Sequence, residues 1–425
     1  MPEPTAPPDL LRVSVLVDLL HRPEAGGHVK AWEKLAAAAA GLAGLDLTVH
    51  FAGAAPATRR LADNVRYRLH RPAFSTARLP FLSHVPDHTD LAPHHPALAR
   101  HLGDADLLHT TDAYFAFAHT AERIARRRGL ALTNSVHTDT PRYTRLFTAE
   151  TIERLCGRAR LGRLLGDRFD LPRRLEARMR RRLLAHQRLC AAALVSRQEE
   201  LAPLARALDP ARVGLLRRGI DRQLFSPAGR DRRWLQTAFG VPPDRLLVLF
   251  VGRVDRGKNV GTLVAALDAL TRAGRPFHLF CAGEGTDRPA VAEQLGPAAT
   301  CPGTLLPADL ARVYAAADVV AHPSEIEEAS NVVLEALASG RPLVTSAAVA
   351  RGAVVDGETG LVAGGTPADW AAALARLEAD AALRDRLGTA GRRWVEATVP
   401  TWREVLEQDL LPVWRRAAAA VGKAR

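Results

Sequence analysis

Two glutamates stand eight residues apart in the stretch from His322 to Pro342, which reads HPSEIEEASNVVLEALASGRP. Glu327 follows a short apolar run that ends near His322, and Glu335 lies in a helical pattern that ends at Gly340. Ionised carboxylates accept several hydrogen bonds each, so this pair is suited to the hydroxyl groups of a sugar or a ribose. Glutamates at this spacing also occur by chance on solvated loops and helices, and spacing alone leaves that alternative open.

A loop with three cations follows the apolar run 246–251 and precedes another helical pattern. It reads GRVDRGKN from Gly252 to Asn259. The start of a helix presents backbone N–H groups and the positive end of the helix dipole, both of which favour an anion. Arg253 adds a planar guanidinium and Lys258 a mobile ammonium, so the loop indicates a phosphate site. The structural alternative is a pair of surface cations beside a helix start.

Two more loops of small residues follow strand-like runs in the second half. Gly283 begins Gly-Glu-Gly after the run 277–281, and Gly303 and Leu305 stand in the segment CPGTL. Small residues in such loops let a ligand approach the backbone. They also serve ordinary turns, so each loop alone is a weak signal for a binding site.

A glycine pair and a histidine occupy comparable places in the first half. Gly26 and Gly27 stand in AGGH, between the first strand-like run and the first helical pattern. His137 follows the run 131–136 in the segment SVHTDTP. Glycines there let backbone approach a ligand closely. An ordinary turn explains the glycines equally well, and a lone histidine is more often structural than functional.

Strand-like apolar runs alternate with helical patterns along the whole chain. The predicted strands are 12–18, 47–51, 107–110, 131–136, 191–195, 212–216, 246–251, 277–281, 318–321 and 342–345. The predicted helices are 29–42, 119–128, 173–187, 260–272, 307–316, 331–338 and 368–377. This alternation predicts parallel sheets covered by helices on both faces. Ligands of such sheets bind at the carboxyl ends of the strands, where the strand order reverses.

The alternation breaks between residues 221 and 244, where two proline-containing segments interrupt the periodicity. We therefore expect an N-terminal Rossmann-like domain at 1–222 and a C-terminal Rossmann-like domain at 223–400. Residues 401–425 are helical in pattern with one proline. The 425 residues are enough for two domains with sizeable cores.

Composition excludes several classes of protein. The chain contains no run of about 18 apolar residues, so no membrane-spanning helix is expected. The proline-rich start MPEPTAPPDLLR lacks the basic and apolar regions of a secretory signal. The four cysteines are widely spaced without a C-x-x-C pair, so we expect neither a disulfide framework nor a zinc site. A reducing cytoplasm is the expected location.

The formal net charge of +12 is concentrated in one segment. Between Arg154 and Arg182 stand eleven arginines and three acids, with leucines interleaved. One interpretation is a basic amphipathic segment, 154–182, in peripheral contact with an anionic membrane at the inner face. The other is a pair of solvated helices on the first domain. No zinc-finger, helix-turn-helix or RNP-like pattern accompanies the charge, so nucleic acid is not an expected partner.

The order of these motifs resembles that of retaining glycosyltransferases with the GT-B fold, specifically glycosyltransferase family 4 (group 1). The resemblance rests on the Glu-x7-Glu pattern followed by Ala336 and by the Gly340-Arg-Pro turn, preceded by the cationic and glycine loops. It covers nearly the whole chain and is strongest from 246 to 362. It implies an α/β fold of two Rossmann-like, doubly wound domains facing across a cleft, with a C-terminal helix at 401–425 that packs back on the N-terminal domain. It also implies transfer of a sugar from a nucleotide-sugar donor to an acceptor hydroxyl of a glycan or lipid-linked acceptor, with retention.

The resemblance also implies roles for individual residues. Arg253 and Lys258 hold the donor diphosphate, Glu335 grips the ribose, and His137 contacts the transferred sugar. Glu327 lies near that sugar. The implied catalytic residues are His137, Glu327, Arg253 and Lys258. The implied donor-binding residues are Gly26, Gly27, Arg253, Lys258, Gly283, Gly303, Leu305, Glu327, Ser330, Asn331, Val332 and Glu335.

The sequence departs from the family pattern at two places. After Glu327 the run Glu-Ala-Ser replaces the usual bulkier residue and glycine, which puts the identity of the donor sugar in doubt. Arg218 replaces the asparagine that usually precedes Gly219 in the hinge between the domains. The Asp104-Ala-Asp106 triplet has the form of a metal–nucleotide signature from a different fold, and we interpret it as structural.

No cofactor and no metal are expected, and the nucleotide-sugar is a substrate. Two alternatives to transfer remain open. One is a nucleotide-sugar epimerase of the same fold. The other is a non-enzymatic binder of anionic membrane or polysaccharide, built on the arginine-rich segment.

Overall fold

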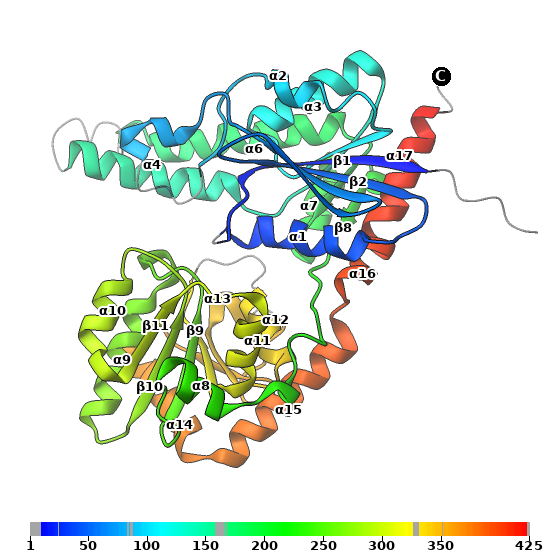
Figure 1. Cartoon of the computed structure of the whole chain (residues 1–425). Helices are drawn as coiled ribbons and strands as arrows, with labels where there is room; N and C mark the ends of the chain where they lie inside the picture. The colour runs from blue at the N-terminus through cyan, green and yellow to red at the C-terminus, as the bar shows by residue number, and fades with distance from the viewer. Residues whose placement is uncertain are drawn as a thin grey trace, which may run out of the picture. The chain divides into compact units, whose positions relative to one another are not determined.

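The computed structural model describes residues 10–23, 25–82, 85, 88–157, 166, 168–325, 331–350 and 352–422, and these divide into two compact units (Figure 1). The N-terminal unit consists of Met1–Arg217 and Trp402–Arg425, and the C-terminal unit of Arg218–Thr401. Each unit is built on its own sheet.

The sheet of the N-terminal unit has the order β3-β4-β2-β1-β5-β6-β7-β8. Its strands are β1 (Leu11–Leu20), β2 (Leu45–Ala52), β3 (Ala57–Ala62), β4 (Val65–His70), β5 (Leu107–Thr110), β6 (Ala131–Ser135), β7 (Ala192–Val195) and β8 (Val213–Leu215). All neighbours pair in parallel except β3, which runs antiparallel to β4. The order reverses between β1 and β5, so the carboxyl ends of these strands mark the switch point.

Helices cover both faces of this sheet. They are α1 (Gly27–Ala39), α2 (Pro96–Ala99), α3 (Ala116–Arg128), α4 (Thr140–Cys156), α6 (Leu171–Leu189), α7 (Gln198–Ala207), α16 (Trp402–Val405), the π-helical η8 (Leu406–Leu410) and α17 (Leu411–Gly422), with short 3-10 turns η1 (Thr76–Arg78), η2 (Pro80–Leu82) and η4 (Pro210–Arg212). Strand β1 shows why the layers form. Val13, Val15 and Val17 pack with α1 and the C-terminal tail, whereas Leu16 packs with α2 and α3. Side chains alternate between the faces of a strand, so an apolar strand needs a cover on each side.

The sheet of the C-terminal unit is entirely parallel, with the order β11-β10-β9-β12-β13-β14. Its strands are β9 (Leu246–Val251), β10 (Phe277–Ala282), β11 (Ala299–Gly303), β12 (Val319–His322), β13 (Leu343–Ser346) and β14 (Leu361–Ala363). The order reverses between β9 and β12. The loops after these two strands therefore lie where ligands of doubly wound sheets bind.

Two cores flank this sheet, one with α8, α11 and α12 and one with α9, α10 and α14. The helices of the unit are α8 (Arg232–Phe239), α9 (Val260–Arg272), α10 (Arg288–Leu295), α11 (Pro307–Ala316), α12 (Asn331–Ala338), α13 (Ala347–Ala350), α14 (Pro367–Ala379) and α15 (Ala381–Thr398), with short 3-10 turns η5 (Pro227–Gly229), η6 (Arg256–Lys258) and η7 (Gly296–Ala298). These two sheets with helices on both faces confirm the α/β, doubly wound class that the alternation predicts.

Elements without a clear apolar period escaped the sequence analysis. Strand β3 is almost wholly exposed and reads ATRRLA, so it shows no buried face. Strand β11 reads ATCPG at the edge of its sheet, where a proline is tolerated because one side needs no ladder bond. Helix α4 ends in the arginine-rich segment, which hides its pattern.

The arginine-rich segment 154–182 falls on the end of α4 and the first half of α6, which pack together, while 158–165 and 167 lie outside the described residues. Within the described part of the chain, no helix is both long and apolar enough to cross a bilayer.

Candidate active site

The cationic loop of the C-terminal unit is ordered by its own aspartate. Asp255 is the N-cap of η6, and its Oδ1 accepts a hydrogen bond from the Lys258 backbone N–H at 3.0 Å. Its Oδ2 lies 3.4 Å from Arg253 Nε. Asn259 then adopts a left-handed conformation (φ 54°) before α9 begins at Val260. The loop thus fixes Arg253 and Lys258 at the carboxyl end of β9, beside the switch point.

The surroundings of Lys258 destabilise its charged form. Burial lowers the pKa of its ammonium to about 8, and the positive charge of Arg253 acts in the same direction. His322, at the end of β12, is buried, and its pKa falls to about 3 because of burial and the nearby Lys258 charge. Positive charge is therefore in excess between β9 and β12. A bound anion would relieve this excess.

Close backbone contacts hold the loops after β9, β10 and β11 together. The Gly252 N–H donates to Ala282 O at 3.0 Å, and the Gly283 N–H donates to Gly303 O at 2.9 Å. Gly283 has φ 147°, and a Cβ atom there would stand 1.8 Å from the Gly252 carbonyl oxygen. Only glycine allows this close approach of two backbones. Packing alone therefore explains the glycine at position 283, without a ligand.

Gly303 is the last residue of the edge strand β11, and Leu305 lies in the loop that follows. Gly303 has φ 85°, and a Cβ atom there would meet Glu284 Oε1 at 2.3 Å. Glu284 forms an ion pair with Arg288 at 2.8 Å. Leu305 is partly buried against the core of α11 and α12. These residues share one sheet edge with the cationic loop.

Glu335 is the centre of a second cluster in this unit. It lies in α12 with 6% of its surface exposed. The charge of Glu335 partly offsets the burial that lowers the pKa of Arg218 to about 10. Burial, and then Glu335, raise the pKa of the Tyr314 hydroxyl well above its ordinary value. Arg218 Nε also donates to Asn331 Oδ1 at 2.8 Å, at the first residue of α12.

The sequence analysis missed the role of Arg218 and Tyr314 around Glu335. Arg218 was noted only as a departure from the family pattern, and its replacement of asparagine was the available signal. Of the other predicted residues, Asn331 and Val332 begin α12. Glu327 and Ser330 lie outside the described residues. Nearby, Asn259 Nδ2 lies 3.5 Å from Glu325 Oε1, which links the loops after β9 and β12.

In the N-terminal unit the glycine pair begins a helix. Gly26 is the N-cap of α1 and Gly27 its first residue, and both are exposed. No side chain caps this helix start. The next residue, His28, stacks on His137 with ring centroids 4.5 Å apart and an angle of 12° between the ring planes. The structure thus brings the glycine loop and His137 together at the carboxyl ends of β1 and β6.

A chain of hydrogen bonds reaches His137 from the interior. Trp32 Nε1 donates to His137 Nε2 at 3.1 Å, and Ser135 Oγ lies 2.8 Å from the same nitrogen. Ser135 Oγ also lies 2.9 Å from Nε2 of the buried His109. Trp414 Nε1, from α17, donates to His109 Nδ1 at 3.2 Å.

These bonds can run in only one direction. An indole N–H is always a donor, so Nδ1 of His109 and Nε2 of His137 are both acceptors. Burial lowers the pKa of His109 to about 3, so its ring is neutral and carries its proton on Nε2. That proton is donated to Ser135, whose hydroxyl donates to His137. In its neutral form His137 therefore carries its proton on Nδ1, and from that atom it is a donor.

His137 was predicted from its motif, whereas this chain of hydrogen bonds was not. Trp32 and Trp414 are separated by most of the chain, and no motif marks either of them; both are buried in the structure. Asp106 of the D-x-D triplet accepts from the Arg12 backbone N–H at 2.8 Å, beside the start of β5. Among the described residues, no cluster of three or more histidines, cysteines or acids is arranged to hold a metal ion.

Part of the C-terminal unit matches a known family model. Residues 245–380 match a family model described as "Glycosyl transferases group 1". The chain is 37% identical over 236 residues to a D-inositol 3-phosphate glycosyltransferase of Salinispora arenicola, covering 50% of this chain and 52% of that protein. It is 32% identical over 238 residues to the protein of the same name from Nocardioides sp., covering 51% of each. The chain thus spans about half the length of the curated relatives it matches.

Structural comparison extends over nearly the whole chain. Sucrose-phosphate synthase from Thermosynechococcus elongatus aligns with a TM-score of 0.69 at 20% identity, covering 96% of this chain and 100% of that one. WaaG, a glycosyltransferase involved in lipopolysaccharide biosynthesis, aligns with a TM-score of 0.61 at 18% identity, covering 96% and 99%. At these identities the likeness shows a shared fold.

Proposed function

We propose that this chain, which has the GT-B fold and a group 1 glycosyltransferase domain at residues 245–380, transfers a sugar from a nucleotide-sugar donor to an acceptor hydroxyl. One observation carries the proposal. The half-buried Lys258 and the neighbouring Arg253 are fixed at the switch point between β9 and β12, where their excess positive charge suits a diphosphate.

The donor's nucleotide occupies the carboxyl edge of the C-terminal sheet. Arg253 and Lys258 hold the diphosphate, and Glu335 accepts hydrogen bonds from the ribose hydroxyls. Arg218 balances the charge of Glu335 and holds it in place through Asn331. The loops at Gly283 and Gly303 border the nucleoside. Support for this arrangement comes from the order of the motifs and from the shared sheet edge.

In the transfer step, the bond between the anomeric carbon and the donor phosphate oxygen breaks with its electron pair moving to the diphosphate. The acceptor oxygen bonds to the anomeric carbon, and its proton passes to a phosphate oxygen. Arg253 and Lys258 stabilise the charge that develops on the leaving diphosphate. They fill the place that a divalent metal takes in other transferases, so the proposed reaction needs no metal and no cofactor.

His137 is proposed to orient the transferred sugar. Its Nδ1–H donates to a sugar hydroxyl, because the bonds from Trp32 and Ser135 occupy Nε2. A donor suits a hydroxyl or a developing negative charge and does not act as a base. Glu327 and Ser330 keep their proposed place beside the same sugar.

Retention of configuration and the acceptor class are further parts of the proposal. The curated relatives are named for D-inositol 3-phosphate, which makes a phosphorylated polyol the first acceptor to test, before glycan and lipid-linked acceptors. A solved neighbour with 14% identity was crystallised with UDP and glucose, which makes UDP-sugars the first donors to test.

The test is a product assay on the full chain with UDP-, GDP- and ADP-sugars and a panel of acceptors. The expected result is stoichiometric release of one nucleotide and formation of one glycoside, whose anomeric configuration NMR matches to that of the donor. Release of nucleotide together with an inverted glycoside would reject retention but not transfer. Conversion of the donor to its epimer without any glycoside would replace transferase with epimerase.

A further inference from the structure

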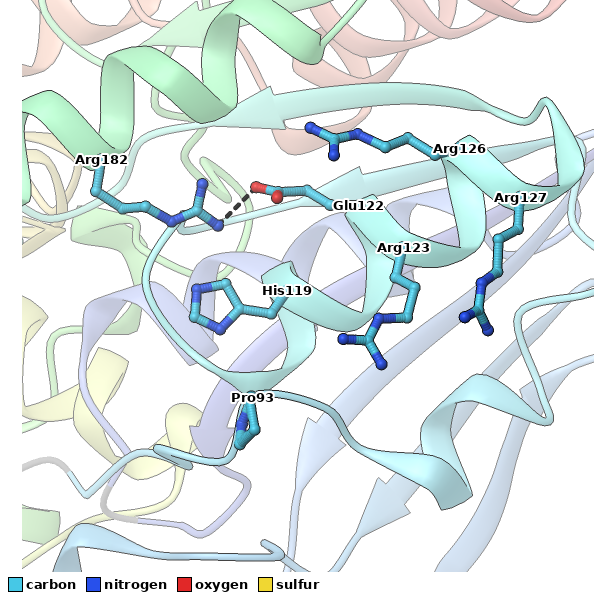
Figure 2. A pocket seen from close by; sticks show the side chains of 7 residues that line it. All are labelled: Pro93, His119, Glu122, Arg123, Arg126, Arg127 and Arg182. Atoms are coloured by element: carbon cyan, nitrogen blue, oxygen red, sulfur yellow. Dashed lines mark hydrogen bonds and ion pairs between the residues drawn. The ribbon is translucent and has the colours of Figure 1, made fainter.

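The N-terminal unit contains a cavity of about 480 Å3 along one side of α3 (Figure 2). Five of its lining side chains belong to one stripe of that helix, at spacings of three and four residues: His119, Glu122, Arg123, Arg126 and Arg127. Arg182 of α6 closes one end, and Pro93 lies below His119 in Figure 2. The arrangement is a concave surface lined by four arginines.

The acid that lines this cavity is already neutralised. Glu122 Oε1 accepts a hydrogen bond from Arg182 Nη2 at 2.6 Å, the dashed contact in Figure 2, and it also contacts Nδ1 of the buried His186. Burial acts to raise the pKa of Glu122, but the bonds to His186 and Arg182 outweigh it and leave the pKa below its ordinary value. The negative charge of Glu122 is therefore committed to these two partners.

Some helical arginines of this chain pair with an acid four residues away, as in Arg180 with Glu176 at 2.8 Å and Arg272 with Asp268 at 2.8 Å. Among the described residues, the three arginines of α3 that line the cavity form no such pair. Within the described residues, no ion pair or hydrogen bond engages the guanidinium groups of Arg123, Arg126 and Arg127. All three are exposed.

The helix dipole does not account for this cluster. Cations near the carboxyl end of a helix are favourable, but the effect fades within the last turn. Arg126 and Arg127 lie in the last turn of α3, whereas Arg123 lies before it. Arg128, in the same turn, donates to the Gly103 carbonyl and so shows what a structural arginine does here. Like charges on one side of a helix repel one another weakly in water, and a bound anion would relieve that repulsion.

We propose that the cavity beside α3 binds a phosphate-bearing ligand. A guanidinium matches two phosphate oxygens at once, and several arginines around one concave surface favour a group with two or more negative charges. The volume lies within the range of sites for small molecules. The phosphate belongs either to a soluble phosphate ester or to an anionic lipid headgroup, and both present the same chemistry to the arginines.

The test uses pyrophosphate as the soluble probe and vesicles as the lipid probe. Every protein carries Lys258→Met, so that the proposed donor site does not contribute. Calorimetry measures pyrophosphate binding, and sedimentation measures binding to vesicles of phosphatidylcholine with and without phosphatidylglycerol. The test variant is Arg123→Gln/Arg127→Gln. The matched control is Arg59→Gln/Arg60→Gln, an equal loss of charge on the exposed strand β3 of the same unit.

The proposal expects the test variant to bind the probe about tenfold more weakly or worse, and the control to stay within about twofold of the parent. Arg123→Lys/Arg127→Lys, which keeps the charges and removes the forks, should fall between them. Thermal melting of each variant should stay near that of the parent, since both arginines are exposed.

The two sources of phosphate separate in the same experiment. Binding of pyrophosphate without binding of phosphatidylglycerol vesicles assigns a soluble ester. Vesicle binding that pyrophosphate displaces assigns a headgroup. No binding of either probe by the parent overturns the proposal, as does an equal loss in the control variant. These outcomes do not depend on whether the chain transfers a sugar, because every protein in the experiment lacks the Lys258 ammonium of the proposed donor site.

Discussion

In the C-terminal unit the loop after the central strand β9 carries three cations, of which Arg253 and Lys258 are half-buried and Arg256 is exposed. In the N-terminal unit the loops after β1 and β6 carry aromatic rings instead, with His28 stacked on His137 and Trp32 bonded to it. Both groups lie at or beside the point where the strand order of their sheet reverses. The same position in the same kind of sheet is thus fitted with charge in one unit and with neutral hydrogen-bonding groups in the other.

This difference follows from what each group is proposed to meet. A diphosphate leaves with negative charge, and full cations that are partly desolvated stabilise it most strongly. A sugar is neutral and presents hydroxyls, for which oriented neutral donors give direction without attracting other anions. The comparison predicts that variants of the C-terminal loop change transfer through charge. Variants of the N-terminal relay should change it through orientation.

The largest effect is expected from Lys258→Met. Loss of the ammonium should lower kcat for transfer by about 10²- to 10³-fold, because a cation at the leaving group is missing. At pH 7 the same variant should be more stable than the wild type, by about 1–3 kcal/mol, since charged Lys258 is held in a site that lowers its pKa to about 8. Rate assays measure the loss of kcat, and thermal melting measures the gain in stability.

Arg256→Gln is the matched control for Lys258→Met, because Arg256 is an exposed cation of the same loop. It should change kcat by less than about threefold. Equal losses from Arg256→Gln and Lys258→Met would mean that the loop acts through its general charge. Unchanged transfer in Lys258→Met would remove the diphosphate site from the account.

The next effect is expected from His137→Ala, with a fall of about 10²-fold in kcat/KM, typical of the loss of one well-placed donor. The affinity for the bare nucleotide should not change, because the nucleotide contacts lie in the C-terminal unit. His278→Ala removes another buried imidazole, one bonded to Thr300 at 2.8 Å, and should leave transfer largely intact. Weaker nucleotide binding in His137→Ala would contradict the division of roles.

A pH series should separate the charged group from the neutral one. The ammonium of Lys258 loses its proton near pH 8, so donor affinity should fall above that pH and approach about tenfold per pH unit. The folding stability of the protein changes with pH in the opposite direction to the donor affinity. Between pH 8 and 10.5 the unfolded chain binds more protons than the folded one, so the free energy of unfolding contributed by this group rises with pH. A donor affinity that stays constant to pH 10 would exclude Lys258 as the contact.

The smallest effect is expected from Trp414→Phe. It removes the N–H that fixes the tautomer of His109, so the relay to His137 loses its direction, and kcat should fall about threefold. Nitrogen NMR should show the His109 proton shared between Nδ1 and Nε2, while the N–H of Trp32 still keeps the His137 proton on Nδ1. Trp370→Phe, which removes an indole bond to the Gly364 carbonyl in the C-terminal unit, is the control. An unchanged tautomer in Trp414→Phe would break the proposed chain of bonds.

Sequence reasoning reached the parts of the site that are local in the chain. The loop from Gly252 to Asn259 is continuous, and its residue types alone indicate an anion. Glu335 was found through its spacing and context. The partners of these residues were not accessible, since Arg218 reaches Asn331 across 113 positions of sequence and Trp414 reaches His109 across 305. Such contacts depend on how strands are ordered in the sheet, which periodicity does not determine.

The fold shows the same division. Strands with a buried apolar run, such as β1 and β9, were predicted because burial on both faces leaves a continuous signal. The exposed strand β3 and the edge strand β11 were not, because their pairing is held by backbone bonds and their side chains carry no pattern.

The most direct test of the central claim is a thermal-shift panel with UDP, GDP, ADP and their common sugar conjugates on the wild type and on Glu335→Gln. A ligand that binds the folded state raises the melting temperature by mass action. The account predicts a rise with the conjugates of one base, sharply reduced in Glu335→Gln, which would also identify that base. No rise with any nucleotide, or an equal rise in the variant, would contradict a donor site built around Lys258 and Glu335.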